Sequence, residues 1–309
     1  MPGIDGKVAL AEELDRLSAH SDLARRAPRG TGIARYLADG INAETSNGVP
    51  DGEFWDMAVH LIQRLSIWWP VSAYAVLPVL TPWCIRDRSA RWQHGPESWG
   101  APRADGYLRD DNSIIKKLPL PLLVDAPGSS PYRGQKPWRG FTACHIWRDL
   151  EDGTVGGVDQ WVYSFMPNLV WLPSPLSPLT DHHPRVQALL QRTSQQMFHG
   201  RELIQAPVSR YSDYVWSKLV PRSAEPSSGP MLDLGELAFF DVDAAFVKRR
   251  LIYVDTFVDG VDRVLAGQSL RKKIICSRYT AQMPLLEHDA LAKFRTDLDD
   301  YRAAVRAGL

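Results

Sequence analysis

The sequence predicts an α+β fold that is mainly helical and contains a small β-hairpin. Apolar residues recur at helical spacing through both ends of the 309-residue chain, and two aromatic-rich runs flank a glycine-rich turn near its middle. The chain is long enough to bury a real core, and its 44% hydrophobic and 23% charged residues are typical of a globular protein. We therefore expect a helical scaffold that carries a hairpin insert.

Helical patterns begin close to the first residue. Leucines recur at helical spacing from Leu10 to Leu17, behind a candidate N-cap at Asp5. A second amphipathic run, Phe54 to Leu65, follows a turn at residues 50–52. The Trp-Trp-Pro sequence at residues 68–70 then predicts the end of that helix, because proline lacks the N–H that a helix needs.

The later helices are predicted in the same way. One follows Pro184, a long amphipathic helix runs from Asp243 to Gly267, and the last follows Pro284. Residues 85–140 are rich in Arg, Pro and Gly, which predicts an irregular connector with one or two strands. We accordingly divide the chain into a helical N-terminal region (1–100), a central region with the connector and the hairpin (101–200), and a helical C-terminal region (201–309).

Composition narrows the class of protein. The 36 basic and 36 acidic residues cancel, so a nucleic-acid surface would have to come from local charge segregation. Three widely separated cysteines argue against a disulfide framework and favour a reducing cytoplasm. The most apolar stretch, residues 67–82, is too short to span a bilayer, so we expect no membrane partner. The eleven tryptophans are expected to be bulky core residues.

Two segments carry the chemistry. The run from Arg139 to Trp147 reads as a strand that ends on the polar pair Cys144-His145. The second segment includes a run from Trp161 to Leu172 that we expect to be a strand. The residues after Asn168 lead to a helix or turn that bears Asp181 and His182. Hydrolysis of a phosphodiester needs a base to deprotonate water and a divalent metal to stabilise the developing charge. A histidine at a strand end, with ligands beside it, can supply this combination.

Residues 139–183 resemble the HNH (ββα-metal) endonuclease family. In that family the first strand ends in a metal ligand that is followed directly by a general-base histidine, which here would be Cys144 and His145. The second strand begins with an asparagine that buttresses the hairpin turn, which here would be Asn168 within Asn-Leu-Val-Trp-Leu-Pro. The resemblance therefore implies a ββα-metal-like hairpin–helix unit within the helical scaffold.

The same resemblance implies metal and phosphate ligands. Ser177 and Asp181 lie nine and thirteen residues beyond Asn168, where the family helix often supplies a ligand. We expect Cys144, Asp181 and His182 to bind a divalent metal, with Mg²⁺ or Mn²⁺ favoured and Zn²⁺ as the alternative. Residues 131–148 contain no acid, and their basic side chains are candidate DNA phosphate contacts: Arg133, Lys136, Arg139 and Arg148.

Three functions stay open at this stage. The first is a metal-dependent DNA endonuclease of restriction or phage-defence type, with His145 as the base. The second is a catalytically inactive HNH-like scaffold that binds nucleic acid or protein, favoured by the unusual Cys144 and Ser177. The third is a tryptophan-rich enzyme of small-molecule metabolism in which the hairpin is only structural. In the two non-nuclease interpretations His145 is a structural histidine, Cys144 a small core residue and Asp181 a helix cap.

Overall fold

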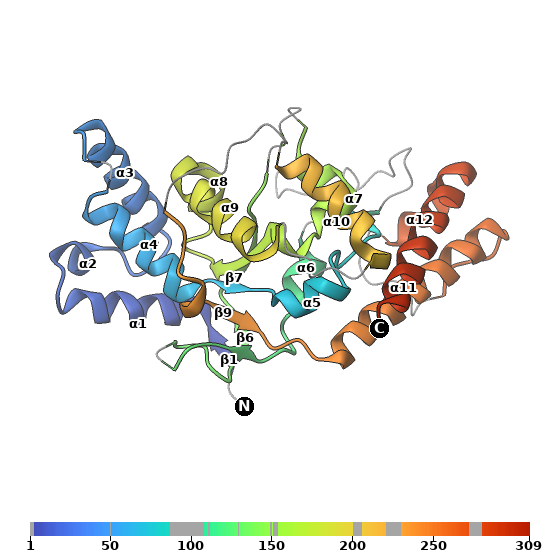
Figure 1. Ribbon diagram of the computed structural model, residues 1–309, viewed down its shortest axis with the longest axis horizontal. Helices are drawn as coiled ribbons and strands as arrows, with labels where there is room; N and C mark the ends of the chain where they lie inside the picture. The colour runs from blue at the N-terminus through green and yellow to red at the C-terminus, as the bar shows by residue number, and fades with distance from the viewer. Residues whose placement is uncertain are drawn as a thin grey trace.

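The computed structural model describes residues 3–49, 51–86, 108–110, 112–128, 130–148, 150, 154–199, 206–220, 230–271 and 280–309. It contains 59% helix and 12% strand, which confirms the mainly helical α+β class. Figure 1 shows the first helices at one end of the molecule, a pair of long C-terminal helices at the other end, and the short strands between them.

The N-terminal end is built from amphipathic helices. The helix predicted behind Asp5 is confirmed, and the Asp5 carboxylate accepts a hydrogen bond from the Lys7 N–H at 2.8 Å. The helix predicted from Phe54 to Leu65 is also confirmed. A third long helix lies within the region 1–100, which the sequence predicts to be helical, but its bounds were not predicted, because its N-cap, Gly32, has no side chain to signal the start. The helices are α1 (Gly6–Ser18), α2 (Asp22–Arg26), α3 (Ile33–Ser46) and α4 (Glu53–Leu65).

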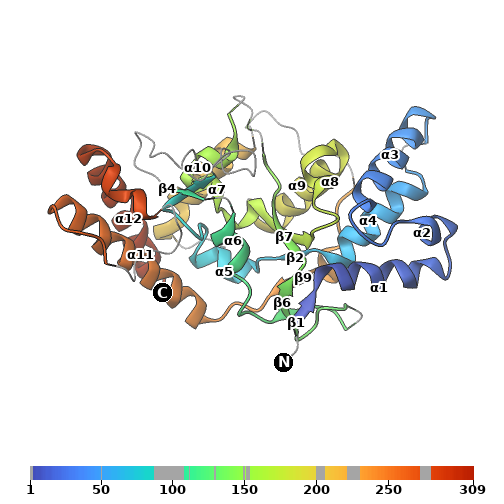
Figure 2. The same cartoon turned by 180° about the vertical axis from the view of Figure 1, so that it is seen from behind.

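A five-stranded sheet occupies the centre. Its strand order is β5-β9-β2-β8-β7, in which β2 and β9 are parallel and the other neighbours are antiparallel. The strands are β2 (Ile67–Trp68), β5 (Val124–Asp125), β7 (Phe141–His145), β8 (Leu169–Pro173) and β9 (Ala238–Phe240). Two smaller sheets pair β1 (Gly3–Asp5) with β6 (Lys136–Arg139), seen from behind in Figure 2, and β3 (Cys84–Arg86) with β4 (Leu108–Asp110).

The expected hairpin is only half correct. β7 and β8 pair antiparallel, with Phe141 opposite Pro173 and His145 opposite Leu169. The prediction of one strand over Trp161–Leu172 is wrong in its first half, which forms the short helices α7 (Gln160–Tyr163) and η3 (Met166–Asn168). The physical reason is a cap, because the Asp159 carboxylate accepts hydrogen bonds from the N–H groups that begin α7. The single turn η2 (Gly156–Val158) precedes that cap.

The remaining helices cover the sheet and form the C-terminal end. The three helices predicted after Pro184, Asp243 and Pro284 are confirmed as α9, α11 and α12. The last two pack against each other, and Arg302 and Arg306 of α12 form ion pairs with Asp255 of α11. These elements are α5 (Val71–Val76), α6 (Ser113–Lys117), α8 (Pro178–His182), α9 (Pro184–Phe198), α10 (Ala206–Leu219), η4 (Leu234–Glu236), α11 (Ala244–Leu265), η6 (Thr280–Leu285) and α12 (His288–Ala307).

Aromatic rings fill the core between sheet and helices. Of the nine tryptophans in the described residues, eight are buried and Trp138 is exposed, so the expected core role is confirmed for these positions. Trp69 lies at the centre of one cluster, with ring centroids 5.5 Å from Trp171, 4.9 Å from Phe240 and 5.5 Å from Phe246. This cluster joins β8, β9 and α11. No helix within the described ranges has an apolar stretch long enough to cross a lipid bilayer.

Gly140, between β6 and β7, gives a stability prediction. Its φ of 73° favours glycine, and a Cβ there would lie 2.3 Å from Asp5 Oδ1 and 2.9 Å from the Lys7 amide nitrogen. Gly134 has a similar φ of 68° with nothing within 4 Å of a Cβ. We expect Gly140→Ala to lower the free energy of unfolding by about 3 kcal/mol, and Gly134→Ala by only about 1 kcal/mol. Urea unfolding of both variants tests this, and equal losses would contradict it.

Candidate functional site

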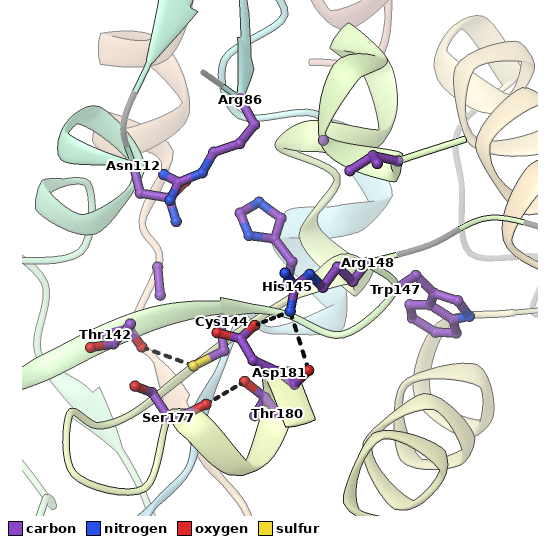
Figure 3. Close-up of a pocket in the computed structure, with 13 residues that line it drawn as sticks. Arg86, Asn112, Thr142, Cys144, His145, Trp147, Arg148, Ser177, Thr180 and Asp181 are labelled. Atoms are coloured by element: carbon purple, nitrogen blue, oxygen red, sulfur yellow. Dashed lines mark hydrogen bonds and ion pairs between the residues drawn. The ribbon is translucent and has the colours of Figure 1, made fainter. Parts of the chain in front are cut away.

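A polar pocket of about 240 Å³ lies where β7, α8 and β3 meet (Figure 3). β7 and the residues directly after it supply one wall, and α8 with the residue before it supplies a second. Arg86 of β3 and Asn112, which precedes α6, lie opposite them. The polar and charged side chains that line the pocket include Arg86, Asn112, Thr142, Cys144, His145, Arg148, Ser177, Thr180 and Asp181.

His145 is held in one tautomer. Its Nε2 lies 2.9 Å from the main-chain oxygen of Tyr163, and the two rings stack with centroids 5.3 Å apart. Because a carbonyl oxygen only accepts, Nε2 must carry the proton and donate it, which leaves the lone pair on Nδ1. Burial lowers the pKa of His145 to about 4, the nearby Arg86 guanidinium adds to the decrease, and the Tyr163 carbonyl opposes it. His145 is therefore a neutral imidazole at pH 7.

Asn168 fixes the chain directly after β7. The side chain is fully buried, its Oδ1 accepts a hydrogen bond from the Trp147 N–H at 2.7 Å, and its Nδ2 donates to the Val162 carbonyl at 3.1 Å. Its own carbonyl accepts a hydrogen bond from the Ile146 N–H at 3.0 Å. The Asn168 side chain thus links the residues after β7 to α7. His145 is the last residue of β7, and its hydrogen-bond acceptor, the Tyr163 carbonyl, is at the end of α7.

Cys144 and Asp181 line the same pocket, but neither is prepared to bind a metal. The Cys144 side chain is buried, and burial raises the pKa of its thiol to about 12, so it is protonated at neutral pH. The Asp181 carboxylate lies 3.7 Å from Nη1 of Arg148, which also donates a hydrogen bond to the Asp181 main-chain oxygen at 3.2 Å (dashed in Figure 3). The carboxylate therefore already faces a cation.

A divalent ion does not fit this donor set. Mg²⁺ and Mn²⁺ need several oxygen ligands, and here one paired carboxylate lies beside a neutral thiol. His182, the third expected ligand, is exposed and does not line the pocket. Within the described ranges, no three His, Cys, Asp or Glu side chains are close enough to bind one ion. The Mg²⁺, Mn²⁺ or Zn²⁺ site stays a prediction, and we derive no chemical step from it.

Arg86 is a pocket residue that the sequence did not identify. It reaches the pocket from β3, and no residue in the described ranges accepts a hydrogen bond from its buried Nη1. The sequence offers only a weak signal, a basic residue at the end of the short apolar run Trp83–Ile85, within a segment that we expected to be irregular. Asn112 was also not anticipated, and its Oδ1 accepts a hydrogen bond from the Tyr163 hydroxyl at 2.8 Å.

Of the four expected phosphate contacts, Arg148 is the one that lines the pocket. Arg139 instead forms an ion pair with Asp5, with Nε 2.6 Å from Oδ2, and its guanidinium lies 4.5 Å from the Trp138 ring centroid. Arg133 is exposed and Lys136 partly buried, both away from the pocket walls. Their role in binding DNA stays a prediction.

Comparisons of the chain with protein-family models, with curated proteins and with solved structures found no match. The pocket lining contains two guanidinium groups, of Arg86 and Arg148, and one carboxylate, of Asp181, while His145 and Cys144 are neutral at pH 7. Its charge is positive, and the hydroxyls of Thr142, Ser177 and Thr180 add polar groups around it.

The lowered pKa of His145 predicts how stability depends on pH. The unfolded chain binds a proton at this residue below pH 6.5, whereas the folded protein binds it only near pH 4. The unfolded state therefore holds more protons between these values, and the free energy of unfolding decreases as the pH falls from 6.5 toward 4, by at most about 3 kcal/mol from this group. Denaturant unfolding at pH 4.5 to 7.5 should show a shallower decrease for His145→Gln. Parallel curves for the two proteins would rule out this contribution.

Proposed function

We propose that the protein hydrolyses phosphodiester bonds of DNA, with the reacting phosphate in the pocket between His145, Arg86 and Arg148. The observation that carries the proposal is a neutral His145 that lines one pocket with two arginines, its Nε2 bound to the Tyr163 carbonyl and its lone pair on Nδ1. Attack of water on a phosphate anion requires a base to deprotonate the water and positive charge to stabilise the phosphate, and one pocket contains both.

His145 would act as the general base. Its Nδ1 takes a proton from water as the water oxygen attacks phosphorus. A base with a pKa near 4 is weak, but a bound phosphate anion beside the imidazole stabilises the protonated form and raises that pKa toward neutrality. The guanidinium groups match the paired oxygens of a phosphate, which positions phosphorus for attack.

The order of elements supports an HNH-like enzyme. β7 and β8 pair antiparallel, His145 ends the first strand, Asn168 immediately precedes the second, and α8 follows with Asp181. The sequence resemblance implies a strand, a strand and a helix in this order, and here α7 and η3 lie between the two strands. DNA as the substrate, a restriction or phage-defence role and a cytoplasmic location are proposed with it.

A second candidate function is a scaffold that binds nucleic acid or protein without cutting. Two observations favour it: the protonated thiol of Cys144, and the ion pair that engages Asp181. Such a protein would keep the positive pocket and would bind DNA through Arg86 and Arg148 with no turnover.

Plasmid nicking by the purified full-length protein tests the proposal. We expect supercoiled plasmid to become open-circular, assayed in parallel with Mg²⁺, Mn²⁺, Ni²⁺, Zn²⁺ and EDTA. DNA binding without nicking in every condition would establish the scaffold function instead. Neither nicking nor binding would remove both candidates.

A further inference from the structure

We infer that Arg86 and Arg148, rather than a divalent ion, supply the positive charge that stabilises the reacting phosphate. This inference rests on the proposed function and makes it more specific: the substrate is a singly charged phosphodiester, and cleavage does not require a metal. Three features of the pocket carry it: the buried N–H of Arg86, the pairing of Arg148, and the poor metal donors around them.

One N–H donor of the Arg86 guanidinium has no acceptor among the described residues. This donor, Nη1, is buried, and a buried N–H is costly unless it is satisfied. The side chain points into the pocket from the wall opposite β7 (Figure 3). A phosphate in the pocket would lie against the Arg86 guanidinium and beside the neutral His145.

Arg148 is the second cation, and Asp181 holds it at the pocket. The Nη1 to Oδ1 distance is 3.7 Å, and the two side chains are 34% and 53% exposed, so the pair is weak. A phosphate oxygen can therefore share or replace the carboxylate as the partner of the guanidinium. In this arrangement Asp181 orients Arg148 and competes with the phosphate for it, which differs from the role of a metal ligand.

The proposed hydrolysis needs only water, His145 and the two arginines. Nδ1 of His145 removes one proton from water, and the water oxygen forms a bond to phosphorus. The bond from phosphorus to the leaving oxygen breaks with its electron pair on that oxygen, which takes a proton from solvent. Arg86 and Arg148 donate hydrogen bonds to the non-bridging oxygens throughout and stay protonated.

The decisive experiment combines EDTA with the variant Asp181→Asn. We expect wild-type protein to nick plasmid in EDTA at a rate within about threefold of that in Mg²⁺. Asp181→Asn should bind the substrate more tightly, with KM lowered severalfold, because Arg148 loses its competing carboxylate. A metal ligand would behave oppositely, since loss of even a residue that supports a metal ligand typically lowers metal affinity or activity about 10- to 100-fold.

Arg86→Gln provides the second arm. We expect kcat/KM for nicking to fall about 100-fold and inhibition by inorganic phosphate to weaken, because one phosphate contact is removed. Arg35→Gln, an exposed arginine of α3 that is 88% accessible, removes the same charge far from the pocket and should change neither quantity. Circular dichroism and thermal unfolding of both variants would show whether they are folded.

The outcomes separate this inference from the proposed function. Nicking in EDTA that survives Asp181→Asn and decreases with Arg86→Gln supports both. Nicking that needs a metal and disappears in Asp181→Asn overturns the inference and leaves the proposed nuclease standing. Absence of nicking in all conditions overturns the proposed function and the inference with it.

Discussion

Alanine at position 145 is expected to lower the rate of plasmid nicking by about 10² to 10⁴, the usual contribution of a positioned general base. The Nε2 of the imidazole is bound to the Tyr163 carbonyl, which leaves the lone pair on Nδ1, the atom that takes the proton from water in the proposed reaction. KM should change little, since the proposed phosphate contacts are the two arginines. Initial rates at pH 7.5, at several DNA concentrations, measure both parameters.

The control is His288→Ala, an exposed histidine at the start of α12 that is 74% accessible. It should nick as fast as wild type. Free imidazole added to His145→Ala should restore part of the rate, because it can enter the space that the side chain leaves. Rescue of this kind distinguishes a base from a residue that only supports the fold. A His145→Ala variant that retains more than a third of the activity would exclude the general-base role.

Asn168→Ala should be the most damaging single change to stability near the pocket. It leaves the buried Trp147 N–H without its acceptor, and it removes one of the donors to the Val162 carbonyl, which still accepts a hydrogen bond from the Phe165 N–H at 3.3 Å. An unsatisfied buried group costs about 1–3 kcal/mol and the lost hydrogen bond to Val162 adds about 1 kcal/mol, so we expect the free energy of unfolding to fall by about 2–4 kcal/mol. Urea unfolding followed by tryptophan fluorescence measures the loss.

Two variants test the cause of that loss. Asn168→Asp keeps an acceptor for Trp147 but loses the donor to Val162 and adds a buried charge, so it should be destabilised as well. Asn42→Ala, at an exposed position in α3, should lie within about 0.5 kcal/mol of wild type. A similarly small effect for Asn168→Ala would show that relaxation or water compensates for the lost amide.

The long helices could be predicted from the sequence because each buries a continuous apolar stripe. The helices behind Asp5 and Asp243 also carry a visible cap, and both carboxylates accept the hydrogen bonds that a cap implies. Trp161 to Leu172 could not be divided correctly by pattern, since its aromatic and β-branched residues suit a strand, and the decisive cap is Asp159, before the run. The two-residue strands β2 and β5 are too short to show any periodicity.

The pocket was only partly predictable for a related reason. Two neighbouring segments, which pair through β7 and β8, supply Cys144, His145, Arg148 and Asp181. Their closeness in the sequence allowed these residues to be assigned to one site. Arg86 reaches them through β3, whose packing on α7 has no local signature. Arg139 was grouped with them by sequence distance alone, and the pairing of β1 with β6 gives it Asp5 as a partner.

The strand order of the central sheet has a consequence for how the protein is made. β2 lies between β8 and β9, so residues 67–68 must pair with chain that is synthesised about a hundred and about a hundred and seventy residues later. Loop closure over such distances is slow, which places sheet completion late in folding. A nascent chain that ends before Ala238 would lack β9 and two of the rings that pack on Trp69, those of Phe240 and Phe246. Excised fragments limited to residues 139–183 should therefore stay unfolded, and the pocket should form only after synthesis has passed the ninth strand.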